Sequence, residues 1–378
     1  MNIKEFKSGG YEQQYEYRSF LPTPINREWV VSDPQILTLL EETNRLLGEL
    51  NGFSQLIPDV DFFIRMHITK EATTSSRIEG TQTNMEEALI GKLDVDPEKR
   101  DDWQEVHNYI QAINFSIKQM DQMPLSNRLL RETHAVLLRG VRGTHKQPGE
   151  FRTSQNWIGV SLNHATFIPP HHLHVPDLMS DLEKFMHNDQ IHVPHLVRIA
   201  FIHYQFETIH PFLDGNGRLG RLLIVLYLVG SGLLHKPALY LSDFFERHTS
   251  DYYDQLMAVR TTQKMEPWLR FFLLGMRETI ALSIQVFRDI LTLKERIERK
   301  YMPTFHVRRQ ANAQMLLKSL YRAPVINIKM VTDLIKTQTN TAAALIDDFV
   351  KLGILRELTG QRRNRLFIFQ DYVRLFKK

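Results

Sequence analysis

The chain has 378 residues, 43% hydrophobic and 24% charged, so it can bury a sizeable core and should form two or three domains. It has no cysteine, which excludes disulfides and thiolate chemistry, and no run of about eighteen apolar residues that would predict a membrane span. The N-terminus lacks a signal-peptide pattern, and we expect a cytoplasmic protein with no membrane partner. Residues 300–378 hold 15 Lys and Arg against 5 Asp and Glu, a balance of +10, whereas the remainder sums to −6.

The first third of the chain is predicted to be an arm followed by helices. Residues 1–35 carry several prolines and little periodicity, which predicts an extended arm packed on the surface. Apolar residues then recur at helical spacing, and we interpret these stretches as scaffold helices. The expected helices cover 34–51, 58–80, 103–113 and 129–138, with a further one starting at Asn84.

Between residues 149 and 170 the pattern changes to two short strands around a turn at Asn163 and His164. An exposed strand edge there could dock an extended segment of another protein by strand addition. A plain surface hairpin is the alternative interpretation.

The twelve residues 210–221 read His-Pro-Phe-Leu-Asp-Gly-Asn-Gly-Arg-Leu-Gly-Arg and lie between two apolar runs that predict buried helices. A Gly-Asn-Gly turn that opens a helix points successive backbone N–H groups at one anion, and the helix dipole adds positive potential. Arg218 and Arg221 are three residues apart, so both can bind phosphate oxygens from one helix face. Asp214 could hold Mg²⁺ between two phosphates, and His210 could take a proton from an incoming hydroxyl because its unperturbed pKa lies near neutrality.

This segment resembles a known family. His-x-Phe-x-Asp/Glu-Gly-Asn-Gly-Arg-x-x-Arg is the signature of Fic-domain proteins, and residues 210–221 match it at every fixed position. The resemblance extends over about residues 10 to 290 and implies transfer of AMP from ATP to a Ser, Thr or Tyr hydroxyl of a protein, with release of pyrophosphate. The Doc branch, which transfers the γ-phosphoryl group, has Lys at the position of Gly217, so nucleotidyl transfer is favoured here.

The resemblance also implies a role for each matching residue. His210 corresponds to the general base and Asp214 to the Mg²⁺ ligand, whereas Phe212 corresponds to a core anchor. The glycines and Asn216 would hold the α- and β-phosphates, the two arginines the outer phosphates, and one of two adjacent tyrosines the adenine. The residues expected to bind ATP in this way are Gly215, Asn216, Gly217, Arg218, Leu219, Gly220, Arg221, Tyr252 and Tyr253.

A second family pattern lies in the N-terminal half. Fic proteins commonly carry an inhibitory helix ending in Ser/Thr-x-x-x-Glu-Gly/Asn, and Ser75, Glu79 and Gly80 fit it. In the family this glutamate pairs with the second motif arginine, here Arg221, and keeps the γ-phosphate from binding productively. A carboxylate on that guanidinium occupies the place of a phosphate, so ATP meets an occupied site. The alternative is a helix C-cap with a surface glutamate.

Two further expectations concern the surroundings of the motif. The strands of residues 149–170 resemble the family's flap, and Thr166, Phe167 and Ile168 are the candidates for lining the target groove and the nucleotide site. His203 lies seven residues before His210 on a similar helix face. We interpret it as a buried core histidine and not as a second base.

The basic C-terminal segment shows helical stretches near 308–321, 328–336 and 340–352, followed by two strands, which resembles a winged helix. In that arrangement residues 340–352 would be the recognition helix, with Arg362 and Arg363 in the wing. However, Asp347 and Asp348 on this helix oppose binding to phosphates. DNA binding, target docking and solubility all stay open as roles of the basic charge.

We therefore predict a mainly α-helical Fic bundle with a small β-hairpin flap and a C-terminal winged-helix-like domain. Its expected domains are 1–125 (Fic-associated, with the inhibitory helix), 126–290 (catalytic core) and 300–378. Expected ligands are ATP and Mg²⁺, and the expected partner is a protein hydroxyl, which could be the chain's own; DNA and a homodimer are further candidates. Three alternatives stay open: phosphoryl transfer, removal of AMP with Glu79 positioning water, and a DNA-binding regulator whose Fic fold senses a nucleotide without turnover.

Overall fold

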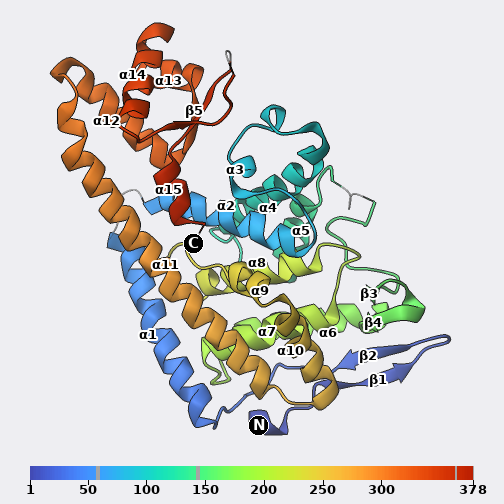
Figure 1. The fold of residues 1–378 in the computed structure, drawn as a ribbon. Helices are drawn as coiled ribbons and strands as arrows, with labels where there is room; N and C mark the ends of the chain where they lie inside the picture. Colours follow the sequence, from blue (N-terminus) through green and yellow to red (C-terminus); the bar gives the residue numbers. More distant parts are fainter. Residues whose placement is uncertain (57–59, 142–144, 362–363, 378) are drawn as a thin grey trace.

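The structure, a computed structural model, describes residues 1–378 with the exception of 57–59, 142–144, 362–363 and 378. It is mainly helical, with three small sheets. Among the described residues, no helix combines the length and the apolar character that crossing a membrane requires. Figure 1 shows two long helices, α1 (Pro34–Leu56) and α11 (Glu266–Lys300), side by side along one edge of the molecule.

Two adjacent helices form the centre of the molecule and carry the motif between them. They are α7 (His195–Ile209) and α8 (Asn216–Gly230), and nearly all of their residues are buried. A helix that is apolar on all sides must be surrounded by other elements. The elements packed against this pair are α2 (Val60–Ile78), α4 (Arg100–Gln119), α5 (Asn127–Leu137), α6 (Val175–His187) and α11.

The remaining helices on this side of the molecule are short connectors or flanking elements. They are α3 (Met85–Ala88), which contacts α2 and α4, α9 (Ser242–Arg247), which contacts α2 and α11, and α10 (Thr249–Thr262), which contacts α9 and α11. The flap predicted around Asn163 and His164 is present as the antiparallel strands β3 (Ile158–Gly159) and β4 (Ala165–Phe167).

The N-terminal segment differs from the extended surface arm that was expected. Strands β1 (Gly9–Gln13) and β2 (Arg18–Pro22) form an antiparallel hairpin, and neighbouring aromatic residues enter the core. The rings of Phe6 and Trp29 lie 5.5 and 5.0 Å from that of Phe201 in α7. Such anchors are irregularly spaced, so they give no periodic signal in the sequence.

Helix α1 is longer than predicted because it packs along α11. Its start is capped by Asp33, whose Oδ1 accepts hydrogen bonds from the backbone of residues 35 and 36. It then continues past Gly52, where an end was expected. A glycine costs a helix about 1 kcal/mol, which tertiary contacts can offset. Three ion pairs join the two helices in parallel order: Asp33 to Arg270, Glu42 to Arg277 and Glu49 to Arg288.

The C-terminal module, residues 301–377 as described, contains the three helices and two strands that were predicted. Its elements are α12 (Val307–Arg322), β5 (Val325–Asn327), α13 (Ile328–Ile335), α14 (Thr339–Lys351), β6 (Arg356–Glu357), β7 (Leu366–Ile368) and α15 (Gln370–Leu375). Of these, β5 and α15 were not predicted, and the sheet order is β5-β7-β6. The resemblance to a winged helix stays a prediction, and Arg362 and Arg363 lie outside the described residues.

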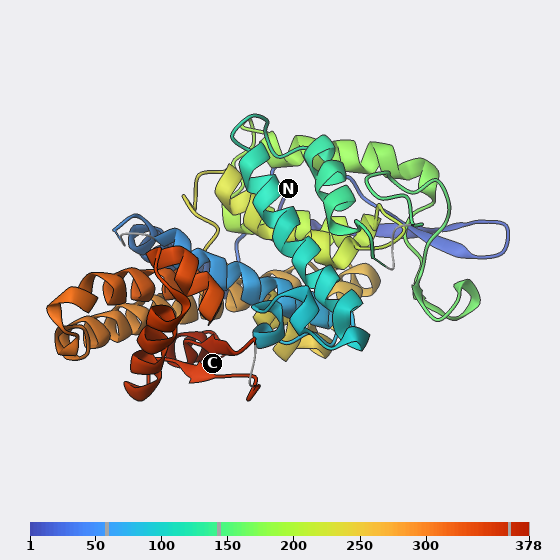
Figure 2. The same ribbon diagram turned by 90° about the horizontal axis from the view of Figure 1, so that it is seen from above.

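The module packs against the inhibitory-helix candidate α2 and away from the N-terminal hairpin, as Figures 1 and 2 both show. The ring of Phe63 in α2 lies 6.0 Å from that of Tyr321 and 6.4 Å from that of Tyr372. His67, one turn further along α2, lies 5.0 Å from Phe376. The module therefore contacts the same helix that leads to Ser75 and Glu79.

Candidate active site

The loop between α7 and α8 has a backbone shape that few residue types adopt. His210 ends α7 in the left-handed conformation with φ of 51°, and Gly215 precedes α8 with φ of 75°. Asn216 holds the loop closed, because its side chain accepts a hydrogen bond from the N–H of Phe212 (2.9 Å) and donates one to its C=O (2.8 Å). The side chain of Asn216 is therefore used within the loop, and only its backbone N–H could face an anion. Phe212 is fully buried, as expected for a core anchor.

Two buried side chains that the sequence did not single out hold the backbone of His210. Arg152 donates to the carbonyls of His210 (3.0 Å), Ile209 (3.3 Å) and Pro170 (2.6 Å). Asn156 donates to the same His210 carbonyl at 3.0 Å. The carbonyls of Ile209 and His210 lie where α7 ends and have no helical partner, so the two side chains position the loop that presents His210.

A third supporting residue is His134 in α5. Its Nδ1 accepts a hydrogen bond from the N–H of Gly149 (2.9 Å), so the proton of the neutral ring is on Nε2, which lies 2.9 Å from the Asp214 carbonyl. The ring stacks on Phe212 with centroids 3.9 Å apart. Burial lowers the pKa of His134 to about 4, so this neutral form is the one present at pH 7.

The imidazole of His210 is also neutral at pH 7. Its pKa is lowered to about 4, first by burial and then by the nearby charges of Arg152 and Arg260. Its Nδ1 is buried and has no hydrogen-bond partner within the described ranges. The value near neutrality expected from the isolated side chain therefore does not hold in the folded protein. A neutral imidazole can nevertheless accept a proton, which a general base must do.

Asp214 points toward solvent beside the start of α8. Its side chain is 42% exposed, and Oδ1 accepts a hydrogen bond from the N–H of Gly215 at 2.6 Å. The residues that the structure describes contain no group of three or more His, Cys, Asp or Glu that could bind a metal alone. One accessible carboxylate beside a helix N-terminus, where phosphates can bind, is nevertheless a donor set that suits Mg²⁺, which takes its other ligands from phosphates and water.

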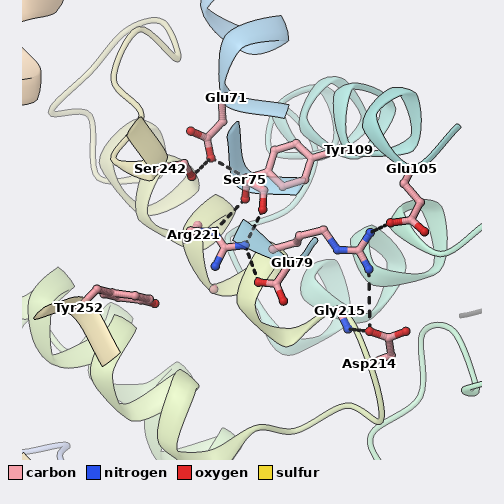
Figure 3. A network of polar contacts seen from close by, with 12 residues as sticks. Glu71, Ser75, Glu79, Glu105, Tyr109, Asp214, Gly215, Arg221, Ser242 and Tyr252 are labelled. Carbon is pink, nitrogen blue, oxygen red and sulfur yellow. Dashed lines mark hydrogen bonds and ion pairs between the residues drawn. The ribbon is translucent and has the colours of Figure 1, made fainter. Parts of the chain in front are cut away.

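The two motif arginines bind different partners (Figure 3). Arg221 is almost fully buried, and its guanidinium donates to Glu79 Oε1 (2.7 Å), Ser75 Oγ (2.8 Å) and the Ser75 carbonyl (2.9 Å). Arg218 pairs with Glu105 of α4 at 3.2 Å and lies 3.8 Å from Asp214. The structure thus brings Ser75, Glu79 and Arg221 together as the family pattern suggested, and adds Glu105, which the sequence did not indicate.

Glu79 directly follows the last residue of α2, and its carboxylate lies beside Arg221 of α8. Its side chain is 34% exposed. Partial desolvation would raise its pKa, but the charge and hydrogen bond of Arg221 outweigh this, so the pKa lies below its usual value and the group is ionised at pH 7. A Cβ atom at Gly217 would come within 2.3 Å of Glu79 Oε1. Gly80 follows with φ of 97°, which ends the helix.

Leu219 and Gly220, which were included among the ATP-binding residues, face the core instead. Leu219 is fully buried, and its N–H bonds to the Gly215 carbonyl within the helix (3.0 Å). A Cβ at Gly220 would lie 2.1 Å from Glu207 Oε1 in α7, so glycine is needed there for helix packing. The N–H groups that α8 leaves without an intrahelical acceptor are those of its first turn, residues 216–218.

The tyrosine pair divides as expected into one packed and one accessible ring. Tyr252 is buried, and its hydroxyl lies 2.9 Å from Nε2 of His203. Tyr253 is 46% exposed, with its ring centroid 5.1 Å from that of Tyr252. His203 is fully buried, and its Nδ1 lies 2.9 Å from the Gly220 carbonyl, which confirms it as a core histidine.

The three flap candidates do not share one surface. Thr166 is exposed. Phe167 is buried, and the central carbon of the Arg260 guanidinium lies 3.8 Å from the centroid of the Phe167 ring. The carbonyl of Ile168 accepts a hydrogen bond from the N–H of Phe20 in β2 (2.9 Å), so the N-terminal hairpin already uses that part of the edge. Phe167 therefore supports the flap from below and does not line a groove.

The site as a whole combines a neutral histidine, an accessible carboxylate and a helix N-terminus with two buried arginines, which is the geometry of an anion-binding and proton-accepting centre. Comparison with known proteins agrees with this class. The family model described as Fic/DOC family N-terminal matches residues 37–118, and the model described as Fic/DOC family matches residues 124–228. Residues 37–118 and 124–228 are therefore identified as Fic/DOC regions.

Among curated proteins, Protein adenylyltransferase Fic of Culex quinquefasciatus is 29% identical over 193 residues, or 48% of this chain and 34% of that protein. Its counterpart in Aedes aegypti is 28% identical over 175 residues, or 44% and 32% of the respective lengths. The match thus spans about a third of the length of these relatives.

Solved structures show the same fold. A Fic family protein from Desulfovibrio desulfuricans has a TM-score of 0.56 at 19% identity, covering 90% of this chain and 97% of that one. Fic-1 from C. elegans has a TM-score of 0.51 at 20% identity, covering 69% and 75%. At these identities the likeness establishes the fold.

Proposed function

We propose that this chain transfers AMP from ATP to a hydroxyl group of a protein, and that Glu79 restrains this activity. The observation that carries the proposal is the pairing of Glu79 with Arg221 in front of a helix N-terminus that adjoins a neutral histidine. Guanidinium groups and helix N-termini bind phosphates, and a carboxylate in that place competes with them. The names of the relatives from two mosquitoes support the same reaction.

The proposed reaction is an in-line displacement at the α-phosphorus of ATP. The target hydroxyl oxygen forms a bond to phosphorus, its proton passes to the imidazole of His210, and the bond to the bridging oxygen breaks to release pyrophosphate. The N–H groups of residues 216–218 and the guanidinium of Arg218 or Arg221 would stabilise the added negative charge. Asp214 would hold Mg²⁺, which neutralises phosphate charge when bound.

The inhibited arrangement follows from the contacts of Glu79. With this carboxylate on Arg221, the guanidinium is not available to the outer phosphates. Ser75 adds two hydrogen bonds to the same guanidinium from one turn earlier in α2. We infer that ATP binds productively only when the end of α2 moves away from Arg221.

The test is incorporation of label from α-labelled and γ-labelled ATP with Mg²⁺, alone and with cell lysate. The proteins compared are the wild type, Glu79→Gly, and Glu79→Gly combined with His210→Ala. We expect α-label to appear with Glu79→Gly, at least about tenfold above wild type, and to vanish in the double variant. Transfer of γ-label would establish phosphoryl transfer instead, and loss of AMP from a modified protein would establish the reverse reaction. No label under any condition would contradict the proposal.

The homodimer and the binding of DNA expected from the sequence stay predictions. In the C-terminal module, Arg309 is paired with Asp348 of α14 at 2.8 Å and Arg365 with Glu357 at 2.6 Å. These pairs reduce the positive charge that a duplex would meet near α14 and the strands. Salt-dependent binding of the full chain to a duplex, retained in His210→Ala, is the observation that would support DNA binding.

A further inference from the structure

A cavity of about 100 Å³ lies beside the inhibitory-helix candidate, between α2, α9, α11 and the end of the chain. Six polar side chains in its wall are at least nine-tenths buried: His67, Glu71, Thr74, Tyr240, Thr279 and Ser283. Four of the six carry a polar atom that has no hydrogen-bond partner among the described residues: His67 Nε2, Glu71 Oε2, Tyr240 Oη and Thr279 Oγ1. A buried polar atom without a partner costs about 1–3 kcal/mol, so such atoms are rare. Four around one cavity indicate a site for a hydrogen-bonding molecule.

The charges around the cavity define the sign of that molecule. Glu71, Asp243 and Asp289 contribute three carboxylates, whereas Lys70 contributes one ammonium group, which already pairs with Asp243 at 3.0 Å. His67 is neutral because burial lowers its pKa to about 3. Burial raises the pKa of the Glu71 carboxyl group, because its ionised form is poorly stabilised inside the protein. The acidic groups still outnumber the one ammonium group, and a charged hydrogen-bond donor in the cavity would stabilise the ionised form of Glu71.

The rest of the wall is apolar. Leu282 and Val286 of α11 contribute aliphatic surface, and Phe376 contributes an aromatic ring. A volume of about 100 Å³ admits a molecule of several non-hydrogen atoms as well as water. We propose that this cavity binds a small organic cation, an amine or amidine on a compact apolar or aromatic body. Its donors would meet Glu71 Oε2 and the hydroxyls of Tyr240 and Thr279, while its body packs against the apolar wall.

The site is linked to Arg221 through one face of α2 (Figure 3). Glu71, Ser75 and Glu79 are spaced four residues apart, so they lie in line on the helix. Glu71 Oε1 accepts hydrogen bonds from Tyr109 (2.8 Å) and Ser242 (2.6 Å), which hold α2 in the position where Ser75 and Glu79 reach Arg221. A molecule that donates a hydrogen bond to Glu71 Oε2 would favour this position of α2. Binding of this molecule should therefore strengthen the restraint by Glu79. The binding site itself does not depend on the proposed function, whereas this effect on AMP transfer rests on it.

Binding is tested by calorimetry on the full chain with benzamidine, an amidinium group on a benzene ring. Benzamide is the matched neutral compound. We expect one benzamidine per chain, with benzamide bound about tenfold more weakly. Glu71→Gln and Thr279→Val, which keep side-chain size, should each weaken benzamidine binding by about tenfold. Glu16→Gln, which removes an exposed carboxylate far along the chain from the cavity residues, should leave it unchanged.

The site is ruled out if benzamidine fails to bind up to about 10 mM. It is equally ruled out if both cavity variants bind benzamidine as the wild type does while their melting temperatures show them folded. Thr279→Val lies in α11 outside the hydrogen bonds of Glu71, so it keeps the test valid if Glu71→Gln does not fold.

The link to Arg221 has its own test, which does not require activity. Because coupling between two sites is reciprocal, Glu79→Gly should lower the affinity for benzamidine several-fold, about 3- to 10-fold. Equal affinity in wild type and Glu79→Gly would overturn the coupling. In the activity assay, benzamidine should lower α-label incorporation by the wild type and leave Glu79→Gly unaffected. Binding with the expected variant pattern, in a chain that transfers no AMP, would reject the proposed function and retain the site.

Discussion

At the scale of single residues, the pKa of His210 predicts the pH dependence of the proposed AMP transfer, in which His210 is the base. A base works in its neutral form, and His210 is neutral above its folded pKa of about 4. AMP transfer by Glu79→Gly should therefore stay level from pH 8 to about 5.5 and fall only as the pH approaches 4. Initial rates of α-label incorporation, with the rates of Glu79→Gly/His210→Ala subtracted, measure this profile. A midpoint near 6.5 would show that His210 keeps the pKa of an exposed histidine.

Arg152 supports the loop between α7 and α8 from inside the protein and does not contact substrate. Its replacement should disturb this loop most. Arg152→Met leaves the carbonyls of Ile209, His210 and Pro170 short of donors, so we expect a loss of about 2–4 kcal/mol in unfolding free energy. In the Glu79→Gly background, kcat should fall about tenfold or more because His210 is less well positioned. Arg131→Met is the control, since Arg131 is partly exposed and should cost little in either measurement. Unchanged kcat in Arg152→Met would contradict the positioning role.

The residues that could be predicted from the sequence are those whose pattern is contiguous. Residues 210–221 and the pair of Ser75 and Glu79 have fixed spacings that no packing requirement explains. Arg152 and Glu105 escaped notice because they act through contacts about 60 and 113 residues away in sequence, with common residue types and no local pattern. The pKa of His210 was out of reach for the same reason, since burial and distant arginines set it.

At the scale of elements, α2 joins the motif to the C-terminal module, and Tyr372 tests this link. Tyr372 is fully buried, with its ring 5.2 Å from that of Tyr321 and 6.4 Å from that of Phe63 in α2. Tyr372→Ala should cost about 3–5 kcal/mol of stability. It should also raise AMP transfer several-fold (about 3- to 10-fold) in the wild-type background, because α2 is held less firmly, with no rise in Glu79→Gly.

The control for this prediction is Phe349→Ala in α14. Phe349 is also fully buried, but its ring contact, 5.5 Å, is with Phe305 inside the module. We expect a similar loss of stability and no gain of AMP transfer. If both variants raise transfer equally, general destabilisation and not the contact with α2 is the cause. Unfolding by urea and α-label incorporation are the two measurements.

Long periodic helices were the predictable elements of this fold. Those of the core and of the C-terminal module lie where apolar spacing placed them, to within a few residues. The hairpin of β1 and β2 and the strand β5 were missed because short strands at element junctions depend on their partners and give no periodic signal. Helix α1 passes Gly52 because contact with α11 outweighs the local preference for an end.

At the scale of the whole molecule, the buried histidines predict acid sensitivity. His67 and His203 have pKa values lowered to about 3, and His134 and His210 to about 4, in each case first by burial. The unfolded chain takes up protons below about pH 6.5 and the folded chain does not, so stability falls as the pH drops from 6.5 toward 4. Glu207 acts in the opposite sense, because burial raises its pKa to about 7.

Between about pH 6.5 and 4.5, the four imidazoles bind protons in the unfolded chain only, whereas Glu207 binds one in the folded chain only. The unfolded chain therefore binds more protons than the folded chain in this range. We expect the unfolding free energy to fall by about 1.4 kcal/mol per pH unit for each unmatched proton. The slope is measured by urea unfolding at about pH 7.0, 6.0 and 5.0. These values cover the range between the pKa of histidine in the unfolded chain and the lowered pKa values in the folded chain. His203→Gln should reduce the slope by one proton. A stability that is constant over this range would mean that these histidines are protonated in the folded protein.

The contact between Glu79 and Gly217 has a consequence for how relatives of this chain can diverge. Any side chain at position 217 would displace the carboxylate, because even a Cβ atom would lie 2.3 Å from Glu79 Oε1. A lineage that acquires lysine there, as the Doc branch has, cannot also keep this restraint. Positions 79 and 217 are therefore expected to covary: glycine at 217 with an acid at 79, and a larger residue at 217 with no selection for the acid. The type of group transferred and the presence of the restraint by Glu79 would then be inherited together.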